Sequence, residues 1–180
     1  MLLSLLNFDM RLSQRLRLSQ TSSVLWRPVA LLAHSGDSWF WASGLALIWL
    51  FGPAEWRRYA AIVEIAIVFE ALLVFPLKMI IRRERPQGEW GSIYRTIDPH
   101  SFPSGHAARA TLLVVLALGL GPSWAGWVMA IWAPLMALSR VMTGVHYLSD
   151  LLGGMVVGVV FGLVTLWVYP LWIAWFPFLF

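Results

Sequence analysis

Residues 146–169, HYLSDLLGGMVVGVVFGLVTLWVY, decide how this chain folds. After Asp150 the stretch contains no charged residue. It is long enough to cross a lipid bilayer as one helix, which takes about 20 apolar residues. Gly154, Gly158 and Gly162 recur at every fourth position, a spacing at which small residues let two membrane helices pack closely. The stretch therefore predicts a membrane-spanning helix with polar residues at one end.

The rest of the chain repeats this pattern of apolar runs. Hydrophobic residues make up 59% of the sequence and charged residues 12%, and the mean hydropathy of +0.73 lies outside the range of soluble proteins. Helices are expected, because an open sheet in lipid leaves backbone groups unpaired. We predict an all-α, polytopic transmembrane bundle of five to six spans, forming a single domain over residues 1–180. The five expected spans are Trp39–Phe51, Tyr59–Ile81, Gly105 to the Gly121-Pro122 break, Ser123–Met142 and Leu148–Tyr169, the last ending before Pro170.

Residues 1–36 are expected to lie at the membrane surface, outside a transmembrane core of residues 37–180. Residues 1–20 carry arginines among leucines, which predicts an amphipathic interfacial helix. A sixth span at about 22–33 is conceivable, but it is short and Arg27-Pro28 splits it, so a re-entrant or surface segment is favoured.

Two further segments connect or end the spans. The connection from Arg82 to Pro103 holds much of the remaining charge, and we expect it to form a structured loop over the polar site, with a flexible surface loop as the alternative. The tail Leu171–Phe180 is apolar but too short to cross again. Its aromatic residues are typical of an interfacial anchor.

Polar residues gather in three short islands at the ends of the apolar runs. They are KMIIRRERP at 78–86, PSGH at 103–106 and SRVMTGVHYLSD at 139–150. When the spans are traced alternately through a bilayer, all three islands emerge on the same face. Charges at membrane depth are costly and mark functional sites, so the sequence predicts one polar site at one face of the membrane.

The islands contain the groups needed for attack on a phosphate. His146 and Asp150 are four residues apart and share a face of a helix, so the carboxylate can orient the imidazole for nucleophilic attack. A plain helix cap is the alternative for this pair. His106 can protonate a leaving oxygen and then activate water.

Cations and a helix start can hold the phosphate itself. Lys78 and Arg85 lie two helical turns apart, on the same side if the helix continues that far, and Arg140 ends the preceding span. Ser104-Gly105 opens a helix whose exposed amides favour an anion, although Ser104 is also a good N-cap. We expect Arg82 and Arg83 to anchor the chain among lipid headgroups.

These islands resemble the signature of the type 2 phosphatidic acid phosphatase (PAP2) family, which includes vanadium-dependent haloperoxidases and glucose-6-phosphatases. The similarity covers about 78–150. The resemblance implies that His146 is a nucleophile forming a phosphohistidine, Asp150 its orienting partner and His106 the general acid. The implied phosphate ligands are Lys78, Arg85, Ser104, Gly105 and Arg140.

The resemblance implies a metal-independent membrane lipid phosphatase with no cofactor, in a bacterial cell membrane. Its substrate would be a lipid phosphate or diphosphate such as phosphatidate, phosphatidylglycerophosphate or undecaprenyl diphosphate. The alternatives are a lipid phosphotransferase using the same site and a non-enzymatic lipid-phosphate binder or transporter. The placement of the arginines, despite a net charge of +4, favours membrane lipids and phosphate over nucleic acid as partners.

Several polar residues lie outside the signature. By the tracing, His34 and Asp37 lie on the active-site face and could shape its entrance. Glu64 and Glu70 lie inside the second span, where an interhelical hydrogen bond or buried pairing is expected. With five spans the arginines favour a cytoplasmic site, whereas the family resemblance points to the outer face.

Overall fold

The computed structural model describes residues 2–20, 24–87, 96 and 98–180, with side chains described from residue 4 onward. Regular structure in these ranges is helical, apart from one isolated antiparallel bridge between Glu84 and His100. The all-α prediction is therefore confirmed. The helices are α1 (Leu2–Leu16), α2 (Trp26–His34), α3 (Ser38–Phe51), α4 (Ala54–Ile81), α6 (Gly105–Leu120), α7 (Ser123–Met142), α8 (Leu148–Trp175) and the 3-10 helix η1 (Pro177–Leu179).

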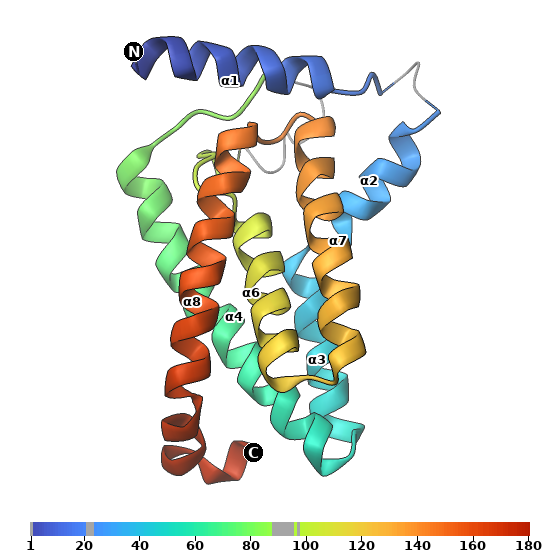
Figure 1. Ribbon diagram of the computed structural model, residues 1–180, viewed down its shortest axis with the longest axis vertical. Coiled ribbons are helices and arrows are strands. Elements are labelled where there is room, and N and C mark those ends of the chain that lie inside the picture. Colours follow the sequence, from blue (N-terminus) through green and yellow to red (C-terminus); the bar gives the residue numbers. More distant parts are fainter. Residues whose placement is uncertain (1, 21–23, 88–95, 97) are drawn as a thin grey trace.

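Each of the five expected spans forms an apolar helix, and together they make the bundle in Figure 1. Helices α4, α7 and α8 are long and apolar enough to cross a membrane alone, while α3 (14 residues) and α6 (16 residues) are shorter. Helix α2 has 9 residues, about 13 Å, which is too short for a sixth crossing. The chain is thus an integral membrane protein.

The expected end of the last span at Pro170 is wrong. Helix α8 continues through Pro170 to Trp175. A proline removes only one backbone donor, and a membrane helix tolerates this where neighbouring groups compensate. The remaining tail forms η1, and the Trp49 Nε1–H donates to the carbonyl oxygen of Leu179 at 2.8 Å.

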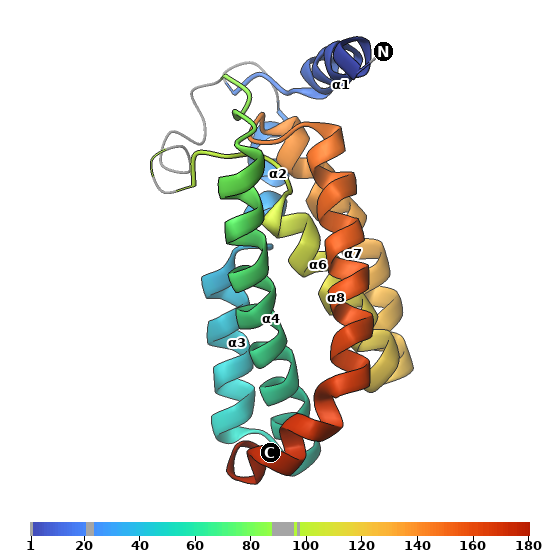
Figure 2. The ribbon, with the colours of Figure 1, turned by 90° about the vertical axis from the view of Figure 1, so that its left-hand side faces the viewer.

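Helix α6 lies between α7 and α8 and also contacts α4 (Figures 1 and 2). Its closest approach follows the glycines of α8. A Cβ at Gly154 would lie 2.4 Å from the Ser104 carbonyl oxygen, and one at Gly158 would lie 2.2 Å from that of Ala108. The expectation that these glycines permit close helix packing is confirmed.

Helix α1 lies across the end of the bundle where α4 ends and α6 and α8 begin (Figures 1 and 2). The Leu148 N–H donates to Ser13 Oγ at 3.0 Å, and the Ser149 N–H donates to Asp9 Oδ1 at 3.1 Å. Phe8 remains exposed. The amphipathic helix is therefore attached by its polar side to the start of α8 and presents apolar side chains outward.

Candidate active site

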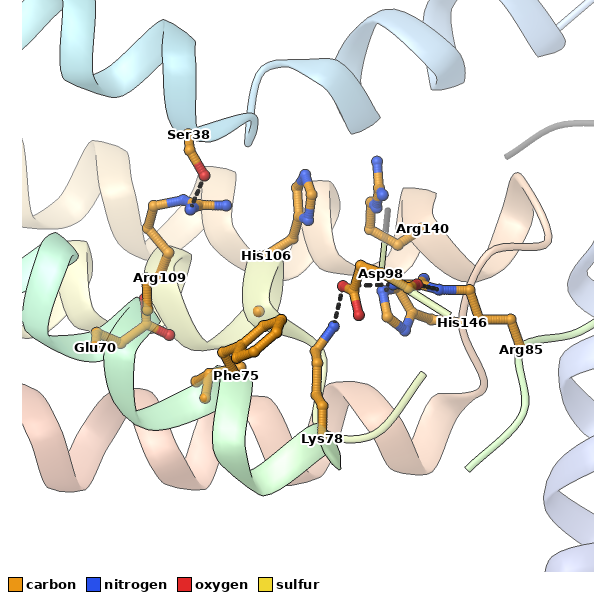
Figure 3. Close-up of a pocket in the computed structure, with 13 residues that line it drawn as sticks. Ser38, Glu70, Phe75, Lys78, Arg85, Asp98, His106, Arg109, Arg140 and His146 are labelled. Atoms are coloured by element: carbon orange, nitrogen blue, oxygen red, sulfur yellow. Dashed lines mark hydrogen bonds and ion pairs between the residues drawn. The ribbon is translucent and has the colours of Figure 1, made fainter. Parts of the chain in front are cut away.

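The three polar islands meet in one cavity of about 230 Å³ at this end of the bundle (Figure 3). The expectation that they share one face therefore agrees with the structure. Ser104 and Asp150 lie just behind the cavity wall, where the Ser104 N–H donates to the Asp150 carbonyl oxygen at 3.0 Å. Six of the eight expected site residues line the cavity: Lys78, Arg85, Gly105, His106, Arg140 and His146.

His146 and Asp150 form a buried pair at the start of α8. His146 lies two residues before the helix, and its Nδ1 is 3.4 Å from Asp150 Oδ2, which also accepts the Tyr147 N–H at 2.8 Å. His146 Nε2 lies 3.2 Å from Arg85 Nη1. With Nδ1 protonated toward the carboxylate, Nε2 carries the lone pair and faces the cationic side of the cavity.

Burial keeps this imidazole neutral. It lowers the pKa of His146 to about 3, because the surrounding protein and the nearby cations Arg85 and Lys78 disfavour the charged ring and outweigh the effect of Asp150. A neutral imidazole at physiological pH has the free electron pair that a nucleophile needs.

The interpretation of Arg83 as a headgroup anchor is wrong. Its guanidinium donates to Asp150 Oδ1 at 2.6 Å, to Asp9 Oδ2 at 2.7 Å and to Ser149 Oγ at 2.5 Å. It also lies over the Tyr147 ring, 4.2 Å from the centroid. Arg83 therefore connects α1 to the carboxylate behind His146, whereas Arg82 is exposed as expected.

Lys78 and Arg85 reach the cavity by a different backbone path from the one expected. Helix α4 ends at Ile81, and Arg82 takes a left-handed conformation with φ of 51°. The chain then leaves helical geometry, and Arg85 meets Lys78 through their common partner Asp98. The two cations thus share the cavity although the helix does not continue to Arg85.

A carboxylate that the sequence did not indicate lies between these cations. Asp98 Oδ2 accepts from Arg85 Nη2 at 2.8 Å and also pairs with Lys78 Nζ. Arg85 further donates to the carbonyl oxygens of Asp98 at 2.7 Å and Val145 at 3.0 Å. Asp98 belongs to the loop expected over the site, of which 88–95 and 97 lie outside the described residues.

The remaining phosphate-ligand candidates come from α6 and α7. Arg140 is 1% exposed, and its Nη1 contacts the Ala33 carbonyl oxygen at 3.5 Å. Ser104 is the N-cap of α6 and accepts the Ala107 N–H at 3.4 Å. Gly105 begins the helix, so exposed backbone amides of the first turn lie beside the cations. The cavity can therefore surround an anion with donors from three helices.

His106 has its own carboxylate partner, Asp37, from the connection between α2 and α3. Asp37 Oδ1 lies 2.9 Å from His106 Nε2, and its Oδ2 lies 2.8 Å from His34 Nδ1. Burial acts to raise the pKa of Asp37, but the hydrogen bonds from the two histidines outweigh it and hold that pKa well below its usual range. Asp37 is therefore an anion that can stabilise a protonated His106.

Each intramembrane glutamate, for which an interhelical hydrogen bond or a buried pairing was expected, keeps one oxygen without a hydrogen bond to any described residue. Glu70 Oε1 and Glu64 Oε2 are buried without a hydrogen-bond partner in the part of the chain that the structure describes. Glu70 lines the cavity, whereas Glu64 faces an apolar hollow between α3 and α4. Arg109, one turn after His106, also lines the cavity and donates to the Gly36 carbonyl oxygen and to Ser38 Oγ.

The chain resembles characterised phosphatases in sequence. It is 30% identical over 122 residues to the undecaprenyl-diphosphatase BcrC of Bacillus subtilis, covering 66% of this chain and 62% of that protein. It is 36% identical over 125 residues to a decaprenylphosphoryl-5-phosphoribose phosphatase of Mycolicibacterium smegmatis, covering 68% of this chain and 67% of that one. The chain thus spans about two thirds of the length of these curated relatives.

The fold is shared with two solved membrane proteins. A PAP2-type phosphatidylglycerolphosphate phosphatase from Bacillus subtilis superposes with a TM-score of 0.73 at 23% identity, covering 90% of this chain and 84% of that one. LpxE of Aquifex aeolicus gives 0.70 at 21% identity, covering 88% and 94%. The model of the PAP2 superfamily matches residues 59–174. Because this match includes the three islands and well over half of the sequence, the chain belongs to the PAP2 superfamily.

Proposed function

We propose that this protein is a membrane lipid phosphatase that works through a phosphohistidine on His146. The observation that carries the proposal is the position of His146: Nε2 faces Arg85 at 3.2 Å, while Nδ1 faces the buried Asp150. A nucleophile oriented by a carboxylate and aimed into a cationic cavity is suited to phosphoryl transfer.

In the first step His146 Nε2 attacks the phosphorus atom and the bond from phosphorus to the lipid oxygen breaks. His106 donates a proton to that oxygen, so the lipid alcohol, or a lipid monophosphate if the substrate is a diphosphate, leaves. Lys78, Arg85 and Arg140 hold the phosphate oxygens and stabilise the negative charge of the transition state. The backbone amides of Gly105 and His106, at the start of α6, add donors.

In the second step water attacks the phosphohistidine. The neutral His106 takes a proton from the water, the bond from phosphorus to nitrogen breaks, and inorganic phosphate leaves. His146 returns to its neutral state. Asp37 is placed to stabilise His106 in the protonated state that starts the first step. The relatives named above are an undecaprenyl-diphosphatase and a decaprenylphosphoryl-5-phosphoribose phosphatase, which supports a lipid-linked substrate.

Phosphate release from short-chain phosphatidate, phosphatidylglycerophosphate and undecaprenyl diphosphate tests the proposal with protein purified in detergent. We expect release from at least one substrate, and loss of release in His146→Ala with normal membrane insertion. Acid-labile radiolabel on wild type but not on His146→Ala would support the phosphohistidine. Full activity of His146→Ala would refute the mechanism, and a strict requirement for added Mg²⁺ would contradict metal independence.

Glycerol added to the same assay distinguishes hydrolysis from phosphotransfer. If glycerol phosphate forms in place of inorganic phosphate, the phosphohistidine is captured by an alcohol, and the enzyme is a lipid phosphotransferase. Binding of lipid phosphate without any turnover would identify the protein as a binder or transporter.

A further inference from the structure

The cavity has a second polar end, away from the cations that are proposed to hold the phosphate. Figure 3 shows His146 and Arg85 at one end, His106 in the middle, and Glu70 with Arg109 at the other end. A volume of about 230 Å³ equals that of about seven or eight water molecules at liquid density. A phosphate at the cationic end therefore leaves the Glu70 end for another part of the substrate.

Glu70 is the unusual group at this end. It is 1% exposed, and its Oε1 has no hydrogen-bond partner within the described ranges of the chain. Leaving a buried acceptor unpaired is costly, and the Glu70 side chain that carries this oxygen lines a cavity rather than solid protein. A substrate group that donates a hydrogen bond would remove this cost on binding.

The charges at this end favour a neutral donor over a second phosphate. The Arg109 guanidinium donates to the Gly36 carbonyl oxygen at 3.0 Å and to Ser38 Oγ at 2.5 Å, and Arg109 and Glu70 lie at the same end of the cavity (Figure 3). One cation beside one carboxyl group leaves little excess positive charge for another anion. A hydroxyl group can donate to Glu70 and accept from Arg109, so it fits both partners.

The positions of His106 and Arg109 along α6 indicate how far the second polar end lies from the bond that is proposed to break. Arg109 follows His106 by three residues, a rise of about 4.5 Å, which is the span of a few covalent bonds. His106 is proposed to protonate the leaving oxygen, so the leaving group passes next to Glu70 and Arg109. Phe75 lines the same cavity and is 56% exposed, which gives the lipid chain an apolar way out.

We propose that Glu70 and Arg109 form a subsite for a free hydroxyl group on the leaving alcohol, a few bonds from the ester oxygen. The preferred substrate class is then a phosphate monoester of a hydroxyl-bearing lipid alcohol, such as a glycerol with a free hydroxyl, rather than a diphosphate. This inference rests on the proposed function for the direction in which the leaving group lies.

Binding to the His146→Ala variant tests the subsite without turnover. The probes are lysophosphatidate, which has a free hydroxyl beside the phosphorylated carbon, its 2-deoxy analogue with the same acyl chain, and farnesyl diphosphate. We expect lysophosphatidate to bind up to about tenfold more tightly than the deoxy analogue, as for one hydrogen bond to an otherwise unpaired buried group. Adding Glu70→Leu should bring this ratio close to one.

Two further double variants complete the test. Glu64→Leu removes another carboxylate of α4, which lies outside the cavity, and should leave the ratio at its parent value. Glu70→Gln keeps the side-chain shape and an acceptor, so it should give an intermediate ratio, and it replaces Glu70→Leu should that variant not fold.

The subsite proposal would be overturned if His146→Ala bound lysophosphatidate and its deoxy analogue equally well. It would also be overturned if neither Glu70 substitution changed the ratio of the two affinities. Tighter binding of farnesyl diphosphate on Glu70→Gln, with no hydroxyl preference in the parent, would assign this end to a second phosphate and also overturn it. Because affinity is read on an inactive variant, these results are independent of turnover by wild type. Absence of turnover would count against the proposed function alone.

Discussion

Replacing Gly158 by alanine should separate two helices that carry opposite sides of the active site. A Cβ at this position would lie 2.2 Å from the carbonyl oxygen of Ala108, which is backbone and cannot rotate away. Ordinary contact requires α6 and α8 to move apart by roughly 1 Å there. Ala108 is two residues from His106, so the displacement would move His106 relative to His146 and the phosphate between them.

A misplacement of about 1 Å can cost about a hundredfold in rate, so we expect kcat/KM for phosphate release to fall by about ten- to a hundredfold. Overpacking should also lower the free energy of unfolding by about 1–3 kcal/mol, visible as a lower melting temperature in detergent. The matched control is Gly44→Ala in α3, where an added Cβ meets no atom within 4 Å. It should keep full activity and gain about 0.5–1 kcal/mol of stability. If Gly158→Ala keeps its activity within about twofold of wild type, close packing of α6 on α8 does not set the catalytic geometry.

Arg83→Met should lower kcat about tenfold or more, because Asp150 Oδ1 loses a charged hydrogen-bond donor at 2.6 Å that is worth about 1.5–3 kcal/mol. The control is Arg82→Met, which changes an exposed arginine. Equal rates for the two variants would contradict this role of Arg83. Asp98→Asn should lower the inhibition constants of inorganic phosphate and vanadate, because the carboxylate that pairs with Lys78 and Arg85 competes with an entering anion; weaker inhibition would show that Asp98 assists binding instead. The low pKa of His146, about 3 in the folded protein, means that the unfolded chain takes up a proton near pH 6.5 while the folded one does not. The melting temperature should therefore fall as the pH falls from about 6.5 toward 3, and His146→Gln should make this fall shallower.

The fold was largely predictable from the sequence, because the length of each apolar run and the spacing of the glycines in the last span are properties of whole helices. Tracing the spans alternately through the bilayer placed the three islands on the same face of the membrane, and this step required no knowledge of how the loops fold. The continuation of α8 past Pro170 was missed because a proline is judged locally as a helix breaker, while packing in the bundle maintains the helix around it. The partial exposure of α1 followed from its leucines and arginines, but its attachment through Asp9 and Ser13 did not.

The candidate site was predictable where its residues lie within one motif. His146 and Asp150 meet because four positions bring them to one side of a helix start, and this distance is local. Asp37, Arg83 and Asp98 enter from connections whose paths depend on tertiary structure. Arg83, for example, reaches Asp150 only because Arg82 takes a left-handed turn after α4. An arginine just after the end of a helix looks the same in sequence whether it faces lipid headgroups or a buried carboxylate.

The burial of the cations also links binding of an anion at the site to the stability of the folded protein. Lys78, Arg85 and Arg140 are 4%, 8% and 1% exposed, so water screens their mutual repulsion poorly, and Asp98 pairs with the first two of them. An anion that binds only the folded form adds about 2.7 kcal/mol at a concentration one hundred times its dissociation constant. Protein stored in phosphate or vanadate should consequently outlast protein stored in chloride at equal ionic strength. Phosphate, which the proposed reaction would release, should therefore stabilise the folded protein.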